Sequence, residues 1–295
     1  MISSPIVAVV TPFDAAGGLD FVALGDYLDL LGAAGVQTIL VNGTTGEFAN
    51  MTAHERRVVL EYCRANWSRQ IVAHVGGTAI GEVVELARHA QEYANVVAVL
   101  APYYFAEPSE AGVGEFFRQV LRASQVPVML YNFPRHTQTV IDPRLVARLA
   151  GEFPVLHGLK DSGGDLAVTR AYKTLRPELR IFVGDDRVGA RLAELGIDGV
   201  VTGAGGPVAE LAVGIATAVR RGDRDRAEDL QRHFDRYTDA RKAMPLADIA
   251  YAKAALGARL PGFPPFVRPP LVTSTPEQRA RIGEFMREEM ESALG

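Results

Sequence analysis

The sequence contains a single cysteine and no long apolar run, and each absence excludes a class of protein. Cys63 alone can form neither an intramolecular disulfide nor a multi-cysteine metal site, as expected in a reducing compartment. Its periodic surroundings, residues 58–63, favour a buried helical thiol over a nucleophile. No apolar run approaches the roughly 18 residues that cross a bilayer, and the first five residues lack a basic signal-peptide region. We therefore expect a cytoplasmic protein with no membrane partner.

An excess of basic charge is also missing. The 31 Lys and Arg residues are fewer than the 35 Asp and Glu residues, and the formal net charge is −4. Because the two signs are interspersed along the chain, we expect no nucleic-acid partner. P-loop, H-E-x-x-H and complete Rossmann motifs are absent. Hydrophobic residues nevertheless make up 48% of the chain, which is enough for a large folded core.

Short β-branched runs alternate with longer segments of helical period, as in parallel strands joined by crossover helices. Eight strands are expected, at residues 6–13, 36–42, 71–77, 96–102, 127–132, 155–162, 180–186 and 199–203. Helical segments between them include residues 21–34, 52–66, 81–94, 109–123 and 166–175. Eight such units can close into an α/β fold of the (β/α)8 TIM barrel type, although an open doubly wound sheet uses the same alternation.

The strand signal stops after the eighth unit. Residues 223–242, 246–256 and 276–294 predict helices. The Pro-rich segment 260–270 predicts an extended strap, because proline interrupts helices. We therefore divide the chain into a catalytic barrel, residues 1–221, and a C-terminal helical extension packed on the barrel, residues 222–295.

Unusual residues follow several predicted strands, at the end where barrels form their active sites. The second strand ends in Asn42-Gly43-Thr44-Thr45-Gly46-Glu47, whose hydroxyls and exposed N–H groups can hold a carboxylate. A tight strand-to-helix turn would select the same residues. Tyr103 and Tyr104 follow the fourth strand and Tyr131 lies near the end of the fifth, where aromatic caps of the core are the alternative.

The sixth strand carries a lysine on its inner face, because alternation places Gly158 and Lys160 on one side. Desolvation disfavours the charged form of an amine, and a neutral amine attacks carbonyls, so Lys160 is a candidate Schiff-base nucleophile. An ion pair with Asp161 or Asp185 would explain the same lysine equally well. His157 falls on the opposite face, and we expect it to pack against helices.

Two carboxylates, Asp185 and Asp186, follow the seventh strand. Adjacent carboxylates could bind a divalent cation, but in a loop between a strand and a helix they more often cap the helix. We therefore predict helix caps and no metal at this position.

Four motifs occur in an order and spacing suited to a barrel: Gly-Thr-Thr-Gly-Glu at 43–47, Pro-Tyr-Tyr at 102–104, Tyr-Asn-Phe-Pro at 131–134 and Gly-Leu-Lys-Asp at 158–161. Together they resemble the dihydrodipicolinate synthase and N-acetylneuraminate lyase family over nearly the whole chain. The resemblance implies that Lys160 forms the Schiff base and that Tyr131 transfers protons. It also implies that Thr44 and Thr45 bind the substrate carboxylate and align Tyr131.

The same resemblance implies a catalytic contribution from Thr45 and a relay completed by Tyr104 of a neighbouring subunit. It further implies a homotetramer built as a dimer of dimers, with no metal and no organic cofactor. The partners would be a small-molecule 2-oxo acid and an aldehyde. The implied substrate-binding residues are Gly43, Thr44, Thr45, Phe133, Arg135, His136, Gly184 and Thr202.

Members of this family diverge in the loop after Tyr131. Dihydrodipicolinate synthases typically carry an arginine immediately before the threonine of this loop, whereas here His136 holds that place and Arg135 precedes it. The turn at 42–46, the aromatic motifs and the strap ending in Arg268-Pro269-Pro270 most resemble 2-keto-3-deoxygluconate aldolases, although residues 135–138 are bulkier than usual there.

The resemblance therefore implies a class I aldolase that reversibly cleaves a 2-keto-3-deoxy sugar acid, such as 2-keto-3-deoxygluconate, to pyruvate and an aldehyde. The enzyme alternatives are a 4-hydroxy-tetrahydrodipicolinate synthase, which condenses pyruvate with aspartate semialdehyde, and a sugar-acid dehydratase. The alternative from another class is an inactive relative that binds a 2-oxo acid.

Overall fold

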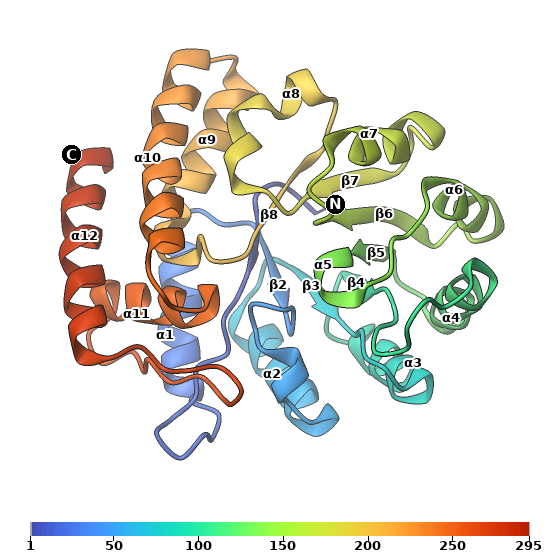
Figure 1. Cartoon of the computed structure of the whole chain (residues 1–295), viewed down its shortest axis with the longest axis horizontal. Helices are drawn as coiled ribbons and strands as arrows, with labels where there is room; N and C mark the ends of the chain where they lie inside the picture. Colours follow the sequence, from blue (N-terminus) through green and yellow to red (C-terminus); the bar gives the residue numbers. More distant parts are fainter. Residues whose placement is uncertain (1, 295) are drawn as a thin grey trace.

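The computed structural model describes residues 2–294, and its eight parallel strands close into a barrel in chain order (Figure 1). Closure is made by β1 pairing with β8, with Ile6 opposite Val201. The predicted TIM barrel is confirmed, and the open sheet is excluded. The strands are β1 (Ile6–Ala8), β2 (Thr38–Val41), β3 (Gln70–His74), β4 (Val96–Leu100), β5 (Val128–Asn132), β6 (Leu156–Asp161), β7 (Arg180–Val183) and β8 (Gly199–Thr202).

Helices surround the barrel. They are α1 (Phe21–Ala33), α2 (Ala53–Asn66), α3 (Ile80–Ala90), α4 (Glu110–Ala123), α6 (Pro143–Glu152), α7 (Leu166–Leu175), α8 (Leu192–Leu195) and α9 (Ala209–Arg221). The short helix α5 (Pro134–Thr137) lies instead in the loop after β5, inside this ring (Figure 1). Three 3₁₀ turns, η1 (Phe48–Asn50), η2 (Asp186–Arg191) and η3 (Gly206–Val208), follow β2, β7 and β8. The loops at the carboxyl ends of these strands are therefore ordered by short helical turns.

Local sequence signals explain where several helices begin. Thr52 and Glu55 form a reciprocal capping box at the start of α2, which satisfies two N–H groups that the helix leaves free. Asp185 caps η2 by accepting from Arg187 N at 3.0 Å, so the predicted cap is confirmed for this carboxylate. Cys63 lies buried in α2, and burial raises the pKa of its thiol to about 12, as expected of a structural cysteine.

The interior of the barrel is filled by side chains rather than open. Small and branched residues dominate it, and Phe182 is the largest of them. The interior cluster is Ile2, Ile6, Ala8, Leu40, Val72, Val96, Ala98, Met129, Phe182 and Val201. This packing supports the strands from within. The next inward-facing side chains, nearer the carboxyl ends of the strands, therefore lie at the mouth of the barrel above a rigid core.

Three helices follow the barrel, α10 (Arg224–Ala243), α11 (Asp248–Arg259) and α12 (Pro276–Leu294), and they stand together on one side of it (Figure 1). The predicted strap runs between α11 and α12 without helical structure. α9 shares a hydrophobic core with α10, α11 and α12, formed by Ile215, Leu230, Tyr251 and Ile282 among others. The division at residue 221 stays a prediction.

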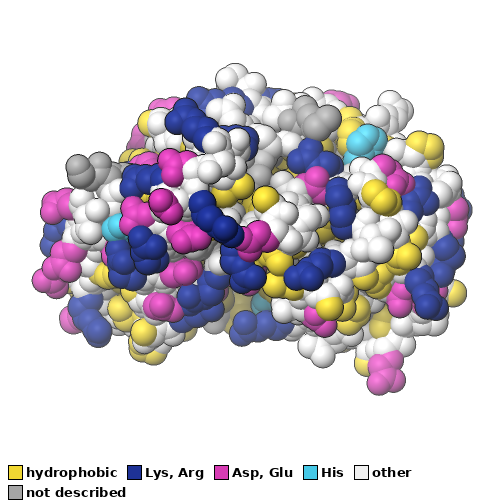
Figure 2. Space-filling view, turned by 90° about the horizontal axis from the view of Figure 1, so that it is seen from above, with side chains coloured by type: hydrophobic (Ala, Val, Ile, Leu, Met, Phe, Trp, Pro, Cys, Tyr) yellow, Lys and Arg dark blue, Asp and Glu magenta, His cyan; other side chains and the backbone are white. Residues whose placement is uncertain are grey.

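The face seen in Figure 2 carries basic and acidic side chains intermixed, with apolar side chains between them. Among residues 2–294, no helix has the length and apolar character needed to span a membrane.

Candidate active site

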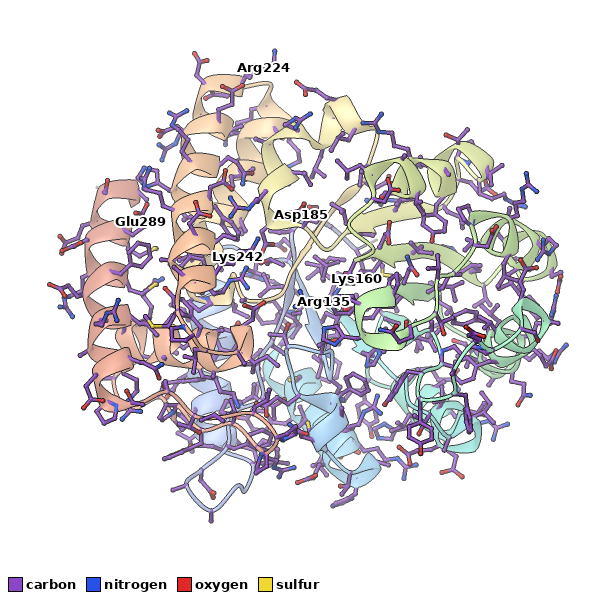
Figure 3. All side chains as sticks on the ribbon, in the orientation of Figure 1. Arg135, Lys160, Asp185, Arg224, Lys242 and Glu289 are labelled. Atoms are coloured by element: carbon purple, nitrogen blue, oxygen red, sulfur yellow. The ribbon has the colours of Figure 1, made fainter. Side chains whose placement is uncertain are left out.

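Lys160 and Tyr131 lie on adjacent strands at the mouth of the barrel. Tyr131 of β5 is opposite Lys160 of β6, which in turn is opposite Phe182 of β7. Lys160 is only 7% exposed, and its Nζ lies 4.1 Å from the centroid of the Tyr131 ring. Figure 3 shows Lys160 and Arg135 inside the ring of helices, whereas Arg224 and Glu289 lie on outer helices. The register thus brings a buried amine against a phenol.

The two carboxylates considered as ion-pair partners of Lys160 are engaged elsewhere. Asp161 is 1% exposed and accepts hydrogen bonds from Asn132 Nδ2 (2.8 Å), Gly163 N (2.9 Å) and Thr169 Oγ1 (2.6 Å). Asp185 is exposed and caps η2. A buried primary amine beside a phenol can form a Schiff base and exchange protons with it.

The turn after β2 has an unusual backbone. Asn42 and Glu47 both adopt left-handed conformations, with φ of 59° and 58°, which non-glycine residues seldom do. Backbone hydrogen bonds from Gly46 N to Gly43 O and from Glu47 N to Thr44 O, both 3.0 Å, close the turn. Backbone strain of this kind persists only where surrounding contacts fix it, and it concentrates at functional sites.

The hydroxyls of this turn face the lysine side of the mouth. Thr44 Oγ1 lies 3.5 Å from the Tyr131 hydroxyl, and both threonines are half-buried. A Cβ added at Gly203, just beyond β8, would lie 3.1 Å from Thr45 Oγ1, so a side chain there would crowd the turn. The structure therefore brings Thr44, Thr45, Tyr131 and Lys160 to one place.

Gly184 follows β7 and lies beside Lys160. A Cβ at Gly184 would come within 3.5 Å of Lys160 Cε and would overlap Ser162 Oγ. A side chain at residue 184 would therefore displace Ser162, whereas it would make an ordinary van der Waals contact with Lys160.

Thr202 ends β8 and is fully buried. Its Oγ1 accepts from Gly205 N at 3.2 Å, and it also hydrogen-bonds the side chain of Asp186. Burial raises the pKa of the Asp186 carboxyl to about 6, although Thr202, Arg241 and Lys160 all favour its charged form. Asp186 and Thr202 line a cavity with Ile215 and Phe234, between the outer face of β8 and the surrounding helices. Asp186 is therefore not the helix cap that the sequence predicted, because Asp185 caps η2.

The loop after Tyr131 forms the short helix α5. Phe133 stacks on Tyr131, with ring centroids 5.6 Å apart and planes at 22°. The His136 ring lies 4.2 Å from that of Phe133, and both Arg135 and His136 are exposed. Desolvation and the neighbouring Arg135 lower the pKa of His136, so its imidazole is neutral at pH 7. This loop presents one cation and one neutral hydrogen-bonding ring.

Tyr104 does not join this group within the chain. Tyr104 is 85% exposed, and the adjacent Phe105 is 70% exposed. The centroids of their two rings lie 5.6 Å apart. Tyr104 has φ of 84°, a strained value for a tyrosine.

His74 was missed in the sequence. It ends β3, is 1% exposed, and its ring lies 6.0 Å from that of Tyr131. Burial lowers the pKa of His74 well below its ordinary value, and Arg56 and Lys160 add to the effect. The neutral ring therefore donates from Nδ1 to Asn42 O (2.9 Å), while Nε2 has no partner. Alternation from the inward Val72 could have identified it.

The position predicted for His157 was wrong. It was expected to pack against helices, but it is exposed at the amino end of β6 and borders a cavity of about 300 Å³ there. The strand starts at Leu156, so its outward face at this point reaches solvent before the helices cover it.

Comparison with known proteins places this geometry in a family. Residues 1–289 match the dihydrodipicolinate synthetase family. A 2-dehydro-3-deoxy-D-gluconate/2-dehydro-3-deoxy-phosphogluconate aldolase of Thermoproteus tenax is 30% identical over 281 residues, covering 95% of this chain and 90% of the relative. A 4-hydroxy-tetrahydrodipicolinate synthase of Acidothermus cellulolyticus is 36% identical over 286 residues, with the same coverage of 95% and 90%.

A solved structure agrees with these relatives. YagE, a prophage protein of the dihydrodipicolinic acid synthase family from E. coli K12, crystallised in complex with pyruvate, superimposes with a TM-score of 0.89 at 28% identity. The match covers 96% of this chain and 97% of that one. The chain belongs to the dihydrodipicolinate synthetase family and is a lyase of its aldolase and synthase type.

Proposed function

We propose that this protein is a class I aldolase that reversibly cleaves a 2-keto-3-deoxy sugar acid to pyruvate and an aldehyde. The observation that carries the proposal is the buried Lys160 amine against the Tyr131 ring, with the Tyr131 hydroxyl 3.5 Å from Thr44 Oγ1. This arrangement offers a nucleophile, a proton-transfer group and a hydroxyl-lined turn for a carboxylate in one buried place.

The reaction begins when the neutral Lys160 amine attacks the C2 carbonyl carbon and water leaves, giving a protonated iminium. The C3–C4 bond then breaks and its electron pair moves toward the iminium nitrogen. Tyr131, which gave its proton to the departing water in the first step, takes the proton of the C4 hydroxyl, and the aldehyde departs. Protonation of the enamine at C3 and hydrolysis of the iminium release pyruvate and restore Lys160. A positioned acid–base group of this kind typically contributes about 10²–10⁴-fold in rate.

The first test is trapping of the Schiff base. Treatment with pyruvate and borohydride should add one reduced pyruvate adduct to the peptide that contains Lys160, measured by mass spectrometry. The Lys160→Arg variant should give no adduct and no turnover, whereas Lys173→Arg, which alters an outer lysine paired with Asp198, should trap like the unmodified protein. An adduct elsewhere, or none, contradicts the covalent mechanism.

The α5 loop supports a sugar acid as substrate. A neutral His136 can accept or donate hydrogen bonds to hydroxyl groups, whereas the second carboxylate of an aspartate semialdehyde adduct calls for a fixed cation. A coupled assay of pyruvate release should therefore show turnover of 2-keto-3-deoxygluconate or its 6-phosphate. If the paired replacement of Arg135 and His136 by alanine leaves activity on every candidate substrate unchanged, this loop does not determine specificity.

The second candidate is a 4-hydroxy-tetrahydrodipicolinate synthase. Two observations favour it: the 36% identity to the Acidothermus cellulolyticus synthase and the exposed Arg135 cation one residue before His136. Condensation of pyruvate with aspartate semialdehyde, with no release of pyruvate from sugar acids, would select this candidate. Loss of water from the sugar acid without cleavage would select the dehydratase, and pyruvate binding without turnover would indicate an inactive relative.

We also propose that the working enzyme is a homotetramer in which Tyr104 reaches the site of a neighbouring subunit. The strained backbone of Tyr104 and the exposure of two adjacent aromatic rings support this arrangement. Light scattering should give the mass of four chains. Tyr104→Phe should lower kcat without changing the assembly, and a fully active monomer would contradict the proposal.

A further inference from the structure

Glu47 ends the Gly43–Glu47 turn and is buried, with 3% exposure. Its Oε1 lies 2.6 Å from Lys253 Nζ of α11, and its Oε2 accepts from Arg268 N of the strap at 3.0 Å. Asn50 Nδ2, at 3.3 Å, is a local donor to the same oxygen. Within residues 2–294, Lys253 of the C-terminal extension is thus the only cationic side chain that hydrogen-bonds the Glu47 carboxylate.

Lys253 is completely buried, 206 positions away from Glu47 in the sequence. Its Nζ also donates to Phe266 O at 2.7 Å and lies 4.4 Å from the centroid of the Phe13 ring. Both charges of the pair have zero side-chain exposure. Breaking one partner would leave an uncompensated charge in the interior, which is far more costly than losing the pair as a whole.

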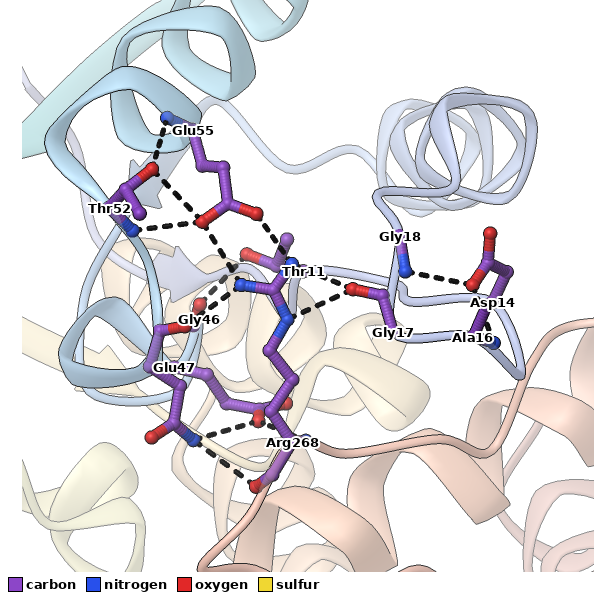
Figure 4. A network of polar contacts seen from close by, with 11 residues as sticks. Thr11, Asp14, Ala16, Gly17, Gly18, Gly46, Glu47, Thr52, Glu55 and Arg268 are labelled. Atoms are coloured by element: carbon purple, nitrogen blue, oxygen red, sulfur yellow. Dashed lines mark hydrogen bonds and ion pairs between the residues drawn. The ribbon is translucent and has the colours of Figure 1, made fainter.

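Arg268 fastens the strap to both flanks of the turn (Figure 4). Its guanidinium donates to Gly17 O at 2.7 and 3.0 Å, to Asn50 O at 2.8 Å, and to both carboxylate oxygens of Glu55 at 2.5 and 3.0 Å. The same group lies over the Phe13 ring, 4.2 Å from its centroid. The strap is therefore held on the loop before α1 and on the start of α2, with Glu47 between them.

The turn itself connects Glu47 to the mouth of the barrel. Glu47 N donates to Thr44 O at 3.0 Å, and Thr44 Oγ1 contacts the Tyr131 hydroxyl. On the other side, Thr11 Oγ1 donates to Gly46 O at 2.8 Å. A displacement of Glu47 would therefore move the threonine hydroxyls and the N–H groups of the turn relative to Lys160.

We propose that Glu47 and Lys253 are positioning residues through which the C-terminal extension holds the Gly43–Glu47 turn in the conformation that binds the 2-oxo acid carboxylate. This inference rests on the proposed function, because it assigns the turn to that carboxylate. It makes the extension a working part of the substrate site rather than an added stabilising layer.

The test measures the pyruvate concentration that half-saturates borohydride trapping at Lys160. The variants are Glu47→Gln, Lys253→Met and the two combined. Each should raise half-saturation roughly tenfold, the loss expected from a misplaced hydrogen bond to a charged ligand, with a smaller change in the limiting trapping rate. The double variant leaves no buried charge, so it should unfold closer to the unmodified Tm than either single variant while its half-saturation stays raised.

The matched control is Glu210→Gln. It removes another ion pair of α11, between Arg259 Nη2 and Glu210 Oε1 of α9 at 2.6 Å, which does not touch the turn. It should lower Tm without changing half-saturation. Unchanged half-saturation in the double variant, or an equal rise in Glu210→Gln, overturns the inference. If the unmodified protein itself gives no adduct, the proposed function fails and this inference fails with it.

Discussion

Replacing Asp161 with alanine removes a buried carboxylate that accepts hydrogen bonds from three donors. The number of donors left without this acceptor sets the expected loss in the free energy of unfolding. Asn132 Nδ2, Gly163 N and Thr169 Oγ1 lie 2.8, 2.9 and 2.6 Å from its oxygens. A buried donor left unsatisfied costs about 1–3 kcal/mol, and entering water recovers part of it, so we expect a loss of about 3–5 kcal/mol in the free energy of unfolding. For a chain of this size, that is a drop in Tm of roughly 10 °C.

The assay is denaturant or thermal unfolding, with Asp165→Ala as the control. Asp165 is an exposed N-cap whose carboxylate accepts from Ala167 N at 2.8 Å, and the loss of this carboxylate should cost about 1 kcal/mol. Asp161→Asn should retain the pH profile of pyruvate trapping at Lys160. The reasoning is refuted if Asp161→Ala unfolds like the control, or if Asp161→Asn shifts that profile, because Asp161 would then be the charge partner of Lys160.

Arg268 lowers the pKa of Glu55 from 4.5 to about 2, so this pair stabilises the fold above pH 4.5 and loses its effect as pH falls toward 2; the unfolding free energies of the unmodified protein and Glu55→Gln should converge over that window. Burial raises the pKa of Asp186 from 3.8 to about 6, so its ionisation costs stability at neutral pH; Asp186→Asn should have the higher Tm at pH 7, and this gain should vanish below pH 4. Gly184→Ala should abolish trapping of pyruvate, because the added methyl overlaps Ser162 Oγ beside Lys160; a normal adduct yield would contradict this reading.

Most of the fold could be predicted because alternation of strand and helix periods is a local signal. All eight strands were found, but several were predicted too long at their carboxyl ends. The seventh was extended to Asp186, whereas β7 ends at Val183 and Asp185 already caps the next turn. Pattern alone does not mark where a hydrogen-bonded ladder gives way to a loop.

Local patterns likewise predicted some residues of the active site and missed others. Alternation placed Lys160 on the inner face of its strand, and the register with Tyr131 followed from the closed barrel. By contrast, the Glu47–Lys253 contact joins residues 206 positions apart, and no local pattern marks them as partners. Whether Lys160 would meet Asp161 or a phenol was likewise decided by packing in three dimensions.

The α5 loop has one more consequence. Its hydrogen bonds are largely internal. The Thr137 hydroxyl lies within hydrogen-bond distance of two carbonyl oxygens, Phe133 O at 3.1 Å and Thr139 O at 3.0 Å, and Gln138 N donates to Pro134 O at 2.8 Å. The loop therefore keeps its own conformation, while the end of β5 that carries it is fixed by the barrel. Mutation or grafting could therefore exchange acceptor preference while the lysine chemistry is inherited intact, a route by which one ancestral pyruvate enzyme could give rise to several.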